Sequence, residues 1–293
     1  YVPLIKLPET SVSFEEGLDI MRDALQPLGE EYLTKMNKGI EEGWIDVYEN
    51  KGKTSGAYSF GCYDSYPYIL LNYTDTLKDV FTIIHEMGHS MHSRYTRDEQ
   101  PYIYGSHSIF TAEVASTVNE SLLMQHLLRT EDEKEMRKYL LNMHLEEFRT
   151  TLFRQTMFAE FEDITHKAIE SGETLTAEWM CQQYEDLNAQ YYGSAVEKDD
   201  VIRYEWARIP HFYNAFYVYK YATGYSAATA ISKKILTEGK PAAQDYISFL
   251  KTGESDHPIE LLKIAGVDMS SPLPVQQAME TFNQLLDEFE SLL

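Results

Sequence analysis

The sequence has 293 residues, of which 43% are hydrophobic, and this is enough for a substantial core in one large domain or two small ones. Its 25 basic and 47 acidic residues give a net charge of −22 that is spread along the chain. This charge argues against nucleic acid and anionic membranes as partners, because phosphate binding needs clustered cations. No apolar run is long enough to span a bilayer, and the two cysteines argue against a disulfide framework and favour a reducing cytoplasm.

Helical patterns dominate the first part of the chain. Ser13 and Glu16 have the spacing of a capping box and predict a helix, and a second helix is expected at 30–43. Two stretches rich in aromatic and β-branched residues, 56–63 and 67–73, are joined by the short connection DSYP and predict a β-hairpin. These are the only strand signals, so the sequence predicts a mainly α protein with one small antiparallel sheet.

The stretch HEMGH follows this hairpin and carries the first chemical signal. Thr76 and Asp79 make another capping box, and apolar residues then recur with helical spacing. Positions i and i+4 lie only about 40° apart around a helix, so His85 and His89 can bind one ion together. Glu86 points about 100° away from His85, where it can take a proton from a water bound to that ion. Imidazole and carboxylate are the usual ligands of zinc, which lowers the pKa of such a water.

A third ligand is needed, and several residues compete for that place. The metzincin pattern requires a glycine at the position of His92 and a histidine three residues later, and the chain has neither. Glu113, in the first turns of a helix predicted at 108–128, is the expected third ligand. Glu120, two turns later on nearly the same face, is either a hydrogen-bond acceptor for a zinc-bound imidazole or an exposed glutamate. Glu99 is the rival ligand but falls in a polar stretch, and His92 is expected to be a packed or surface residue.

The remainder of the chain is predicted to be helical. Thr130 and Glu133 have capping-box spacing, and the pattern continues to Gly172 without proline. At 1.5 Å per residue, one helix over this stretch would be about 60 Å long. Two further helices are expected, one at 176–192 that ends at Gly193 and one from about Val275 to the end.

These motifs together resemble the M3 family of zinc oligopeptidases, and within it the oligoendopeptidase F group. The resemblance is carried by HEMGHSMHS and the AEVAS that follows, and by KTSGAYSFG, PYILLNYT, YGSHSIF, RIPHFYNAFYVYKYATG and the terminal FLKTGESDHPIELLKIAGVDMSSP. It implies a mainly α, zincin-type catalytic domain with long helices. It also implies a metallopeptidase that cleaves short peptides and holds one zinc ion at the base of a channel between two mostly helical halves.

The resemblance also implies roles for individual residues. His85, His89 and Glu113 match the zinc ligands of the family, and Glu86 matches its general base. A further match is the edge strand whose backbone pairs with an extended peptide substrate, at Gly56, Ala57 and Tyr58. Unpaired backbone groups of an edge strand give affinity with little side-chain selectivity.

The segment HFYNAFYVYKY matches a region that supplies histidine and tyrosine hydrogen-bond donors to the substrate and to the oxyanion of the transition state. His211 and Tyr217 are the expected catalytic donors, and the loss of one such donor typically costs about 3 kcal/mol. Tyr213 and Tyr219 are expected to contact the substrate. Because the segment is rich in tyrosine, the alignment can slip, and Tyr213, Tyr219 and Tyr221 compete with Tyr217 for the role at the oxyanion.

The resemblance implies that residues 1–293 form a single catalytic, C-terminal region. Full oligoendopeptidases are about twice this length, and the N-terminal half that covers the channel has no counterpart in a chain that begins with Tyr1. The expected partners are short peptides, and the oligomeric state and cleavage preference stay open.

Two other functions remain as alternatives. A zinc carboxypeptidase or dipeptidyl carboxypeptidase would need a cation, such as Arg208 or Lys220, to fix the carboxylate at the end of its substrate. A peptide-binding protein without catalysis would have no need of Glu86.

Overall fold

The computed structural model describes Ile5 and residues 10–197 and 199–293, and these residues form two compact units. The first unit comprises Tyr1–Leu145 and Gly224–Leu293, and the second comprises Glu146–Thr223. Two helices cross from one unit into the other, α5 (Lys134–Glu147) and α8 (Tyr219–Glu238). Among the described residues, no helix combines the length and hydrophobicity needed to cross a membrane.

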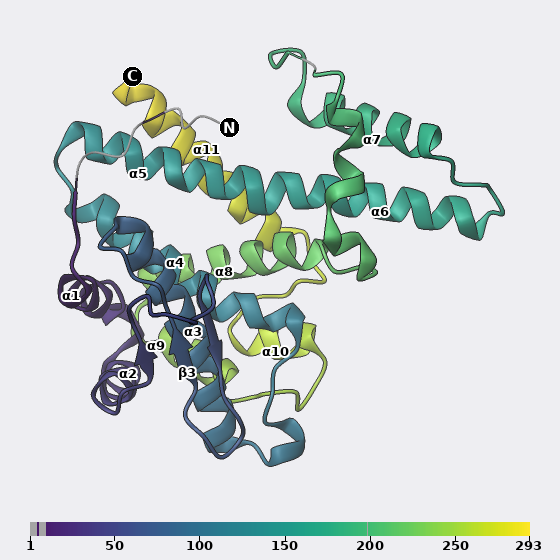
Figure 1. Cartoon of the computed structure of the whole chain (residues 1–293). Helices are drawn as coiled ribbons and strands as arrows, with labels where there is room; N and C mark the ends of the chain where they lie inside the picture. The colour runs from purple at the N-terminus through teal and green to yellow at the C-terminus, as the bar shows by residue number, and fades with distance from the viewer. Residues whose placement is uncertain (1–4, 6–9, 198) are drawn as a thin grey trace. The chain divides into compact units, whose positions relative to one another are not determined.

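The first unit is built from helices around α3, the helix that carries the histidines. Helix α3 packs against α1, α2, α4 and α9 and against strands β2 and β3 (Figure 1). Its buried positions include Val80, Ile84, Met87 and Met91, which are all fully shielded from solvent. The other helices of this unit are α1 (Phe14–Ala24), α2 (Glu30–Glu41), α4 (Ile109–Thr130), α9 (Lys240–Leu250), α10 (Pro258–Ile264) and α11 (Leu273–Leu292), and α3 spans Leu77–Glu99.

Two of the three capping boxes predicted at the start of helices are present. The side chain of Ser13 accepts a hydrogen bond from the Glu16 backbone and Glu16 bonds back, and Thr76 and Asp79 do the same at the start of α3. Each box satisfies backbone N–H groups that the first turn of a helix leaves without partners.

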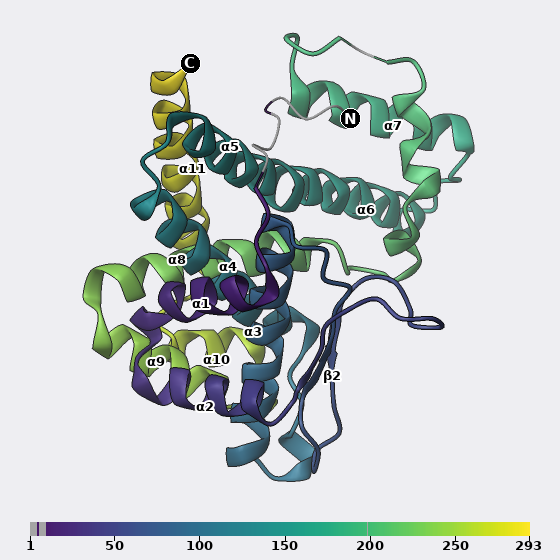
Figure 2. The same cartoon turned by 60° about the vertical axis from the view of Figure 1, so that its left-hand side comes forward.

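The sheet of the first unit has three short strands: β1 (Ile45–Asp46), β2 (Tyr58–Phe60) and β3 (Tyr68–Leu70). The antiparallel pair β2–β3 confirms the predicted hairpin, but β1 pairs parallel to β3, so the sheet is mixed rather than antiparallel. Strand β1 was missed because two residues are too short to show alternation. The strand order is β1-β3-β2, which places β2 at an edge, beside α3 in Figure 2.

The predicted long helix is present but begins three residues later than expected. Helix α4 continues to Thr130, whose hydroxyl bonds back to the His126 carbonyl and therefore does not cap a new helix. Glu133 instead accepts hydrogen bonds from the backbone N–H groups of Glu135 and Met136. The helical run then passes from α5 through a π-helical segment, η3 (Phe148–Phe153), into α6 (Arg154–Glu170).

The second unit has its own apolar core between α6 and α7 (Ala177–Tyr192). Helix α7 is capped by Thr176 and ends at Gly193, as predicted. The buried carboxylate of Glu205 accepts hydrogen bonds from Arg154 and Tyr184, each at 2.5 Å, and so ties the turn η4 (Ile202–Arg208) to both helices. The core residues are Met157, Phe158, Phe161, Tyr184, Leu187, Ile209 and Val218.

Candidate metal centre

Three predicted ligands from α3 and α4 lie together in the first unit. The Nε2 atoms of His85 and His89 are 3.1 Å apart, and Glu113 Oε2 lies 3.5 Å from the first and 3.6 Å from the second. Atoms that share a tetrahedral zinc ion at about 2.1 Å lie about 3.4 Å from one another. The spacing and the chemistry of this donor set therefore fit a zinc ion, and the three residues form a candidate metal cluster.

The other ring positions of both histidines are held by hydrogen-bond acceptors. His85 Nδ1 lies 3.2 Å from Glu120 Oε2, and the His89 ring hydrogen-bonds the backbone of Ala112. Metal-binding histidines usually donate their second N–H in this way, which fixes the tautomer and leaves the first nitrogen free to bind a cation. Glu120 therefore lies where an acceptor for a ligand imidazole was expected.

The charges around the two imidazoles favour a cation between them. Burial by itself lowers the pKa of His85, but the hydrogen bond and negative charge of Glu120, with the charge of Glu113, outweigh it and raise that pKa to about 9. Burial and the neighbouring His85 lower the pKa of His89 to about 4. The same negative charges that favour a proton on His85 would favour a metal cation in its place.

Glu86 lies on the same helix but outside this cluster. Its side chain is 7% exposed, and burial raises the pKa of the carboxyl, while the charge of His85 and a hydrogen bond from the Ser59 backbone act in the opposite direction. Ser59 belongs to β2, and its hydroxyl lies 2.7 Å from that of Ser90 on α3. The edge strand is therefore attached to α3 beside the proposed base.

Gly88 explains how α3 and α4 come close enough to share a metal. A Cβ atom at this position would lie 2.6 Å from Ser116 Cα and 2.7 Å from the Ala115 carbonyl oxygen, both in α4. Asn119 adds a side-chain hydrogen bond of 3.2 Å to the Ile84 carbonyl across the same interface. The glycine of HEMGH was not recognised as a site residue, although its place inside the motif was a signal for it.

The expected substrate strand lies at the edge of the sheet. Tyr58 begins β2, and its side chain is 47% exposed. Gly56 has a φ of 88°, which suits glycine, and its carbonyl accepts a hydrogen bond from the Asn72 side chain at 2.8 Å. Ala57 lies between the two and precedes the strand.

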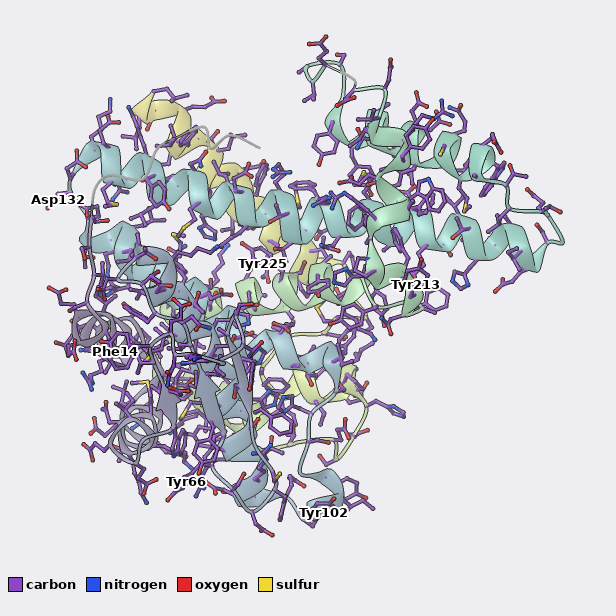
Figure 3. All side chains as sticks on the ribbon, viewed as in Figure 1. Phe14, Tyr66, Tyr102, Asp132, Tyr213 and Tyr225 are labelled. Carbon is purple, nitrogen blue, oxygen red and sulfur yellow. The ribbon has the colours of Figure 1, made fainter. Side chains whose placement is uncertain are left out.

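The residues expected to supply hydrogen-bond donors lie in the second unit. The rings of His211 and Tyr217 are 5.8 Å apart, and Tyr221 lies 6.0 Å from His211 and 5.6 Å from Tyr217. His211, Tyr217 and Tyr221 thus form one cluster, which is called the donor cluster below. Tyr213 is 88% exposed at the end of its turn (Figure 3), and Tyr219 is exposed at the first residue of α8.

The rejected ligand candidates lie elsewhere. Glu99 is exposed at the last residue of α3. His92 is buried and stacks on the partly buried His107, with ring centroids 4.1 Å apart. The Nδ1 atoms of both rings are sealed from solvent and have no hydrogen-bond partner among the described residues.

Comparison with known proteins agrees with this architecture. The model of Peptidase family M3 matches residues 12–281. The chain is 54% identical over its full length to Oligopeptidase PepF of Bacillus subtilis (strain 168) and 46% identical to an Oligoendopeptidase F homolog of Lactococcus lactis subsp. lactis (strain IL1403). It covers 44% and 49% of those two proteins, so it spans about half the length of the curated relatives it matches.

A solved structure shows the same similarity. The crystal structure of oligoendopeptidase-F from Enterococcus faecium matches with a TM-score of 0.74 at 40% identity and covers 97% of this chain and 45% of that one. The match of the family model to nearly the whole chain, together with these full-length identities, places the chain in peptidase family M3.

Proposed function

We propose that this chain is the catalytic region of a zinc metallopeptidase that cleaves internal bonds of short peptides. The observation that carries the proposal is the convergence of His85, His89 and Glu113 at spacings that fit one zinc ion, with Glu86 on the same helix. The peptide substrate class is supported by the names of the relatives, an oligopeptidase and an oligoendopeptidase. We extend the proposal to the whole described chain as one catalytic region.

The chain's residues have distinct tasks in this proposal. A bound zinc ion supplies Lewis acidity, which polarises the scissile carbonyl and makes water more acidic. Glu86 accepts the proton of the attacking water at its carboxylate and delivers it to the leaving amine. Its raised pKa brings the group closer to the range in which both transfers are efficient, because it must be a base first and an acid afterwards.

Substrate binding is assigned to the edge strand and to the donor cluster. An extended peptide can pair with the free edge of β2, where Gly56, Ala57 and Tyr58 offer backbone groups. We assign His211 and Tyr217 as donors to the substrate carbonyl and to the developing oxyanion, and Tyr213 and Tyr219 as substrate contacts. Cys62 and Cys181 are both free thiols, in keeping with a reducing compartment such as the cytoplasm.

The substitution Glu86→Gln tests the mechanism. Because the amide cannot accept the proton, we expect the variant to keep one zinc per chain and to lose about 10²–10⁴-fold in kcat. Metal analysis and hydrolysis of an internally quenched peptide by the intact protein measure both quantities. Glu99→Gln makes the same charge change on an exposed position of the same helix and should keep full activity. A Glu86→Gln protein that retains zinc and wild-type turnover would contradict the proposal and favour a different base.

No observation favours the carboxypeptidase alternative. The Arg208 guanidinium is bonded to Glu205 at 2.5 Å, and the Lys220 ammonium lies 5.5 Å from the centre of the Tyr217 ring. Product analysis on a peptide blocked at both ends separates the two functions, since an exopeptidase cannot cut it.

A further inference from the structure

A buried carboxylate in the second unit holds the turn that precedes Tyr217. Glu162 lies on α6 and is only 4% exposed, and its Oε1 atom accepts the backbone N–H of Phe216 at 2.7 Å. A carboxylate that is removed from water needs strong hydrogen-bond donors. This hydrogen bond therefore attaches the chain segment 214–218 to α6.

The residue that Glu162 holds has an unusual backbone conformation. Phe216 has a φ of 55°, and Asp75 is the one other non-glycine residue with a positive φ among those described. Bulky side chains rarely adopt this region, so the surrounding structure must impose it. Burial of the ring does not supply the constraint, because Phe216 is 48% exposed.

A second contact from the same helix holds the side chain. His166 lies one turn after Glu162 on α6, and its ring centroid is 4.6 Å from that of Phe216. Residues four apart lie on one face of a helix. Glu162 thus binds the backbone of Phe216 and His166 packs against its ring. This arrangement is called the Phe216 clamp below.

The clamp acts on the residue that follows it. Val218 is 1% exposed in the core of the second unit, and Tyr217 lies between this anchor and Phe216. The backbone angles of Phe216 therefore set the direction of the Tyr217 side chain, which meets His211 in the donor cluster. Release of Phe216 to a negative φ would turn Tyr217 away from its present partners.

We propose that Glu162 is a positioning residue that holds Tyr217 in the geometry required for the transition state. This inference rests on the proposed function, because it needs Tyr217 to act on the substrate. Glu162 itself does not touch the substrate in this scheme. Its effect should therefore appear only through Tyr217.

A double-mutant cycle in the intact, zinc-loaded protein tests the inference. Glu162→Ala, Tyr217→Phe and the double variant are compared for kcat, KM and zinc content with an internally quenched peptide. A misplaced catalytic group can lower the rate by about 10²-fold. We therefore expect Glu162→Ala to lower kcat by about 10–100-fold. KM and zinc content should change little. On the Tyr217→Phe background the same substitution should change kcat by less than about threefold.

Two further variants separate positioning from folding. Glu162→Gln keeps an oxygen that can accept the Phe216 N–H and should restore most of kcat, while Asp163→Ala removes an exposed neighbouring charge on α6 and should have no effect. If Glu162→Ala does not fold, the inference is tested instead by measuring kcat of Glu162→Gln and hydrogen exchange at the Phe216 amide. Near-wild-type kcat and a protected amide support the clamp, and rapid exchange at that amide in the wild-type protein overturns it.

The outcomes distinguish this inference from the proposed function. Equal losses from Glu162→Ala on the wild-type and Tyr217→Phe backgrounds would show a general structural role and overturn the clamp alone. If Tyr217→Phe has full activity while Glu86→Gln has none, the role of Tyr217 is wrong and the inference is rejected with it. Full activity of Glu86→Gln overturns the proposed function without reference to Glu162.

Discussion

His85 and His89, the proposed ligand histidines, show how the surroundings of single residues can favour a cation. Glu120 and the Ala112 backbone occupy the second nitrogens of His85 and His89, so both Nε2 atoms face the same point. Two imidazoles that face each other at 3.1 Å would repel if both were charged. The side chains are thus arranged for an ion that is shared between them.

The stacked pair His92–His107 provides a pH test at the residue scale. Burial, reinforced by the charge of His89, lowers the pKa of His107 to about 4, and burial lowers that of His92 still further. Because the folded state binds the proton less readily than an unfolded histidine with a pKa of about 6.5, the stabilisation is complete above pH 6.5 and is lost as the pH falls toward 4. For His107 alone, the free energy of unfolding should decrease by about 2 kcal/mol between pH 7 and pH 5.

Urea unfolding of the metal-free protein at the two pH values measures this loss. The substitution His107→Phe keeps a ring for the stack with His92 but cannot bind a proton. Between pH 7 and pH 5, the free energy of unfolding of this variant should decrease less than that of the wild type, by about the same 2 kcal/mol. Identical pH dependence in both proteins would show that His107 is not buried in its neutral form.

At the scale of elements, the metal centre depends on the close approach of α3 and α4. Gly88 faces the backbone of Ser116, where no side chain can be accommodated by a rotamer change. Because Glu113 lies one turn before Ser116 on α4, any outward shift of that helix moves a ligand away from the two histidines of α3. The geometry of the candidate metal cluster therefore depends on the close packing of α3 against α4.

The substitution Gly88→Ala should weaken both the packing of α3 against α4 and the binding of zinc. A Cβ atom 2.6 Å from Ser116 Cα must push the helices apart, and overpacking of this kind costs about 1–3 kcal/mol of stability. We expect zinc affinity, measured by competition with a chelator, to fall at least 10-fold, comparable to the loss of a residue that orients a ligand. Gly224→Ala is the matched control, since its nearest neighbour would be Glu113 Cβ at an ordinary 3.8 Å. Unchanged zinc affinity in Gly88→Ala would contradict this account.

Elements that depend on local signals could be predicted from the sequence. The boxes at Ser13 and Thr76 are complete within four residues, and His85 and His89 share a side of any helix that contains them. The box at Thr130 was wrong because the same residues also continue α4, and the sequence does not show which hydrogen bond forms. Glu113 was predicted through helix spacing, but Gly88 and the backbone of Ala112 matter only once two helices are packed together.

The donor cluster is the part of the site that sequence reasoning located least well. Four tyrosines of one segment competed, and their order along the chain does not show which of them meet. Phe216 has a positive φ, and its backbone N–H is bonded to Glu162, which is distant in sequence. Such a tertiary constraint leaves no periodic pattern.

At the scale of the whole molecule, the two units have separate sources of stability. The proposed metal ligands belong to the first unit, whereas the second has the core around Phe158 and Tyr184. Ligand binding stabilises the cooperatively folding unit that contains the binding site. The units should therefore respond differently to removal of the metal.

Zinc removal from the intact protein should loosen the first unit selectively. Zinc present at a hundredfold excess over its dissociation constant adds about 2.7 kcal/mol to the stability of the state that binds it. After chelation we expect faster hydrogen exchange in α3 and α4, while the amides of α6 and α7 keep their protection. Mass-spectrometric exchange with and without chelator measures the difference, and uniform loosening of all four helices would show that the units unfold together.

The position of the proposed ligands along the chain has a consequence for when a metal could bind during synthesis. His85 and His89 lie on α3, and Glu113 and the acceptor Glu120 lie on α4, which follows after residues 100–108, so only a small loop must close to bring them together. Loops of this size close at little entropic cost, and contacts that are near in sequence form early. If the proposed zinc ion binds, a nascent chain could therefore hold it as a helical hairpin before the donor cluster has been synthesised, and the ion would then act as a template for the rest of its unit.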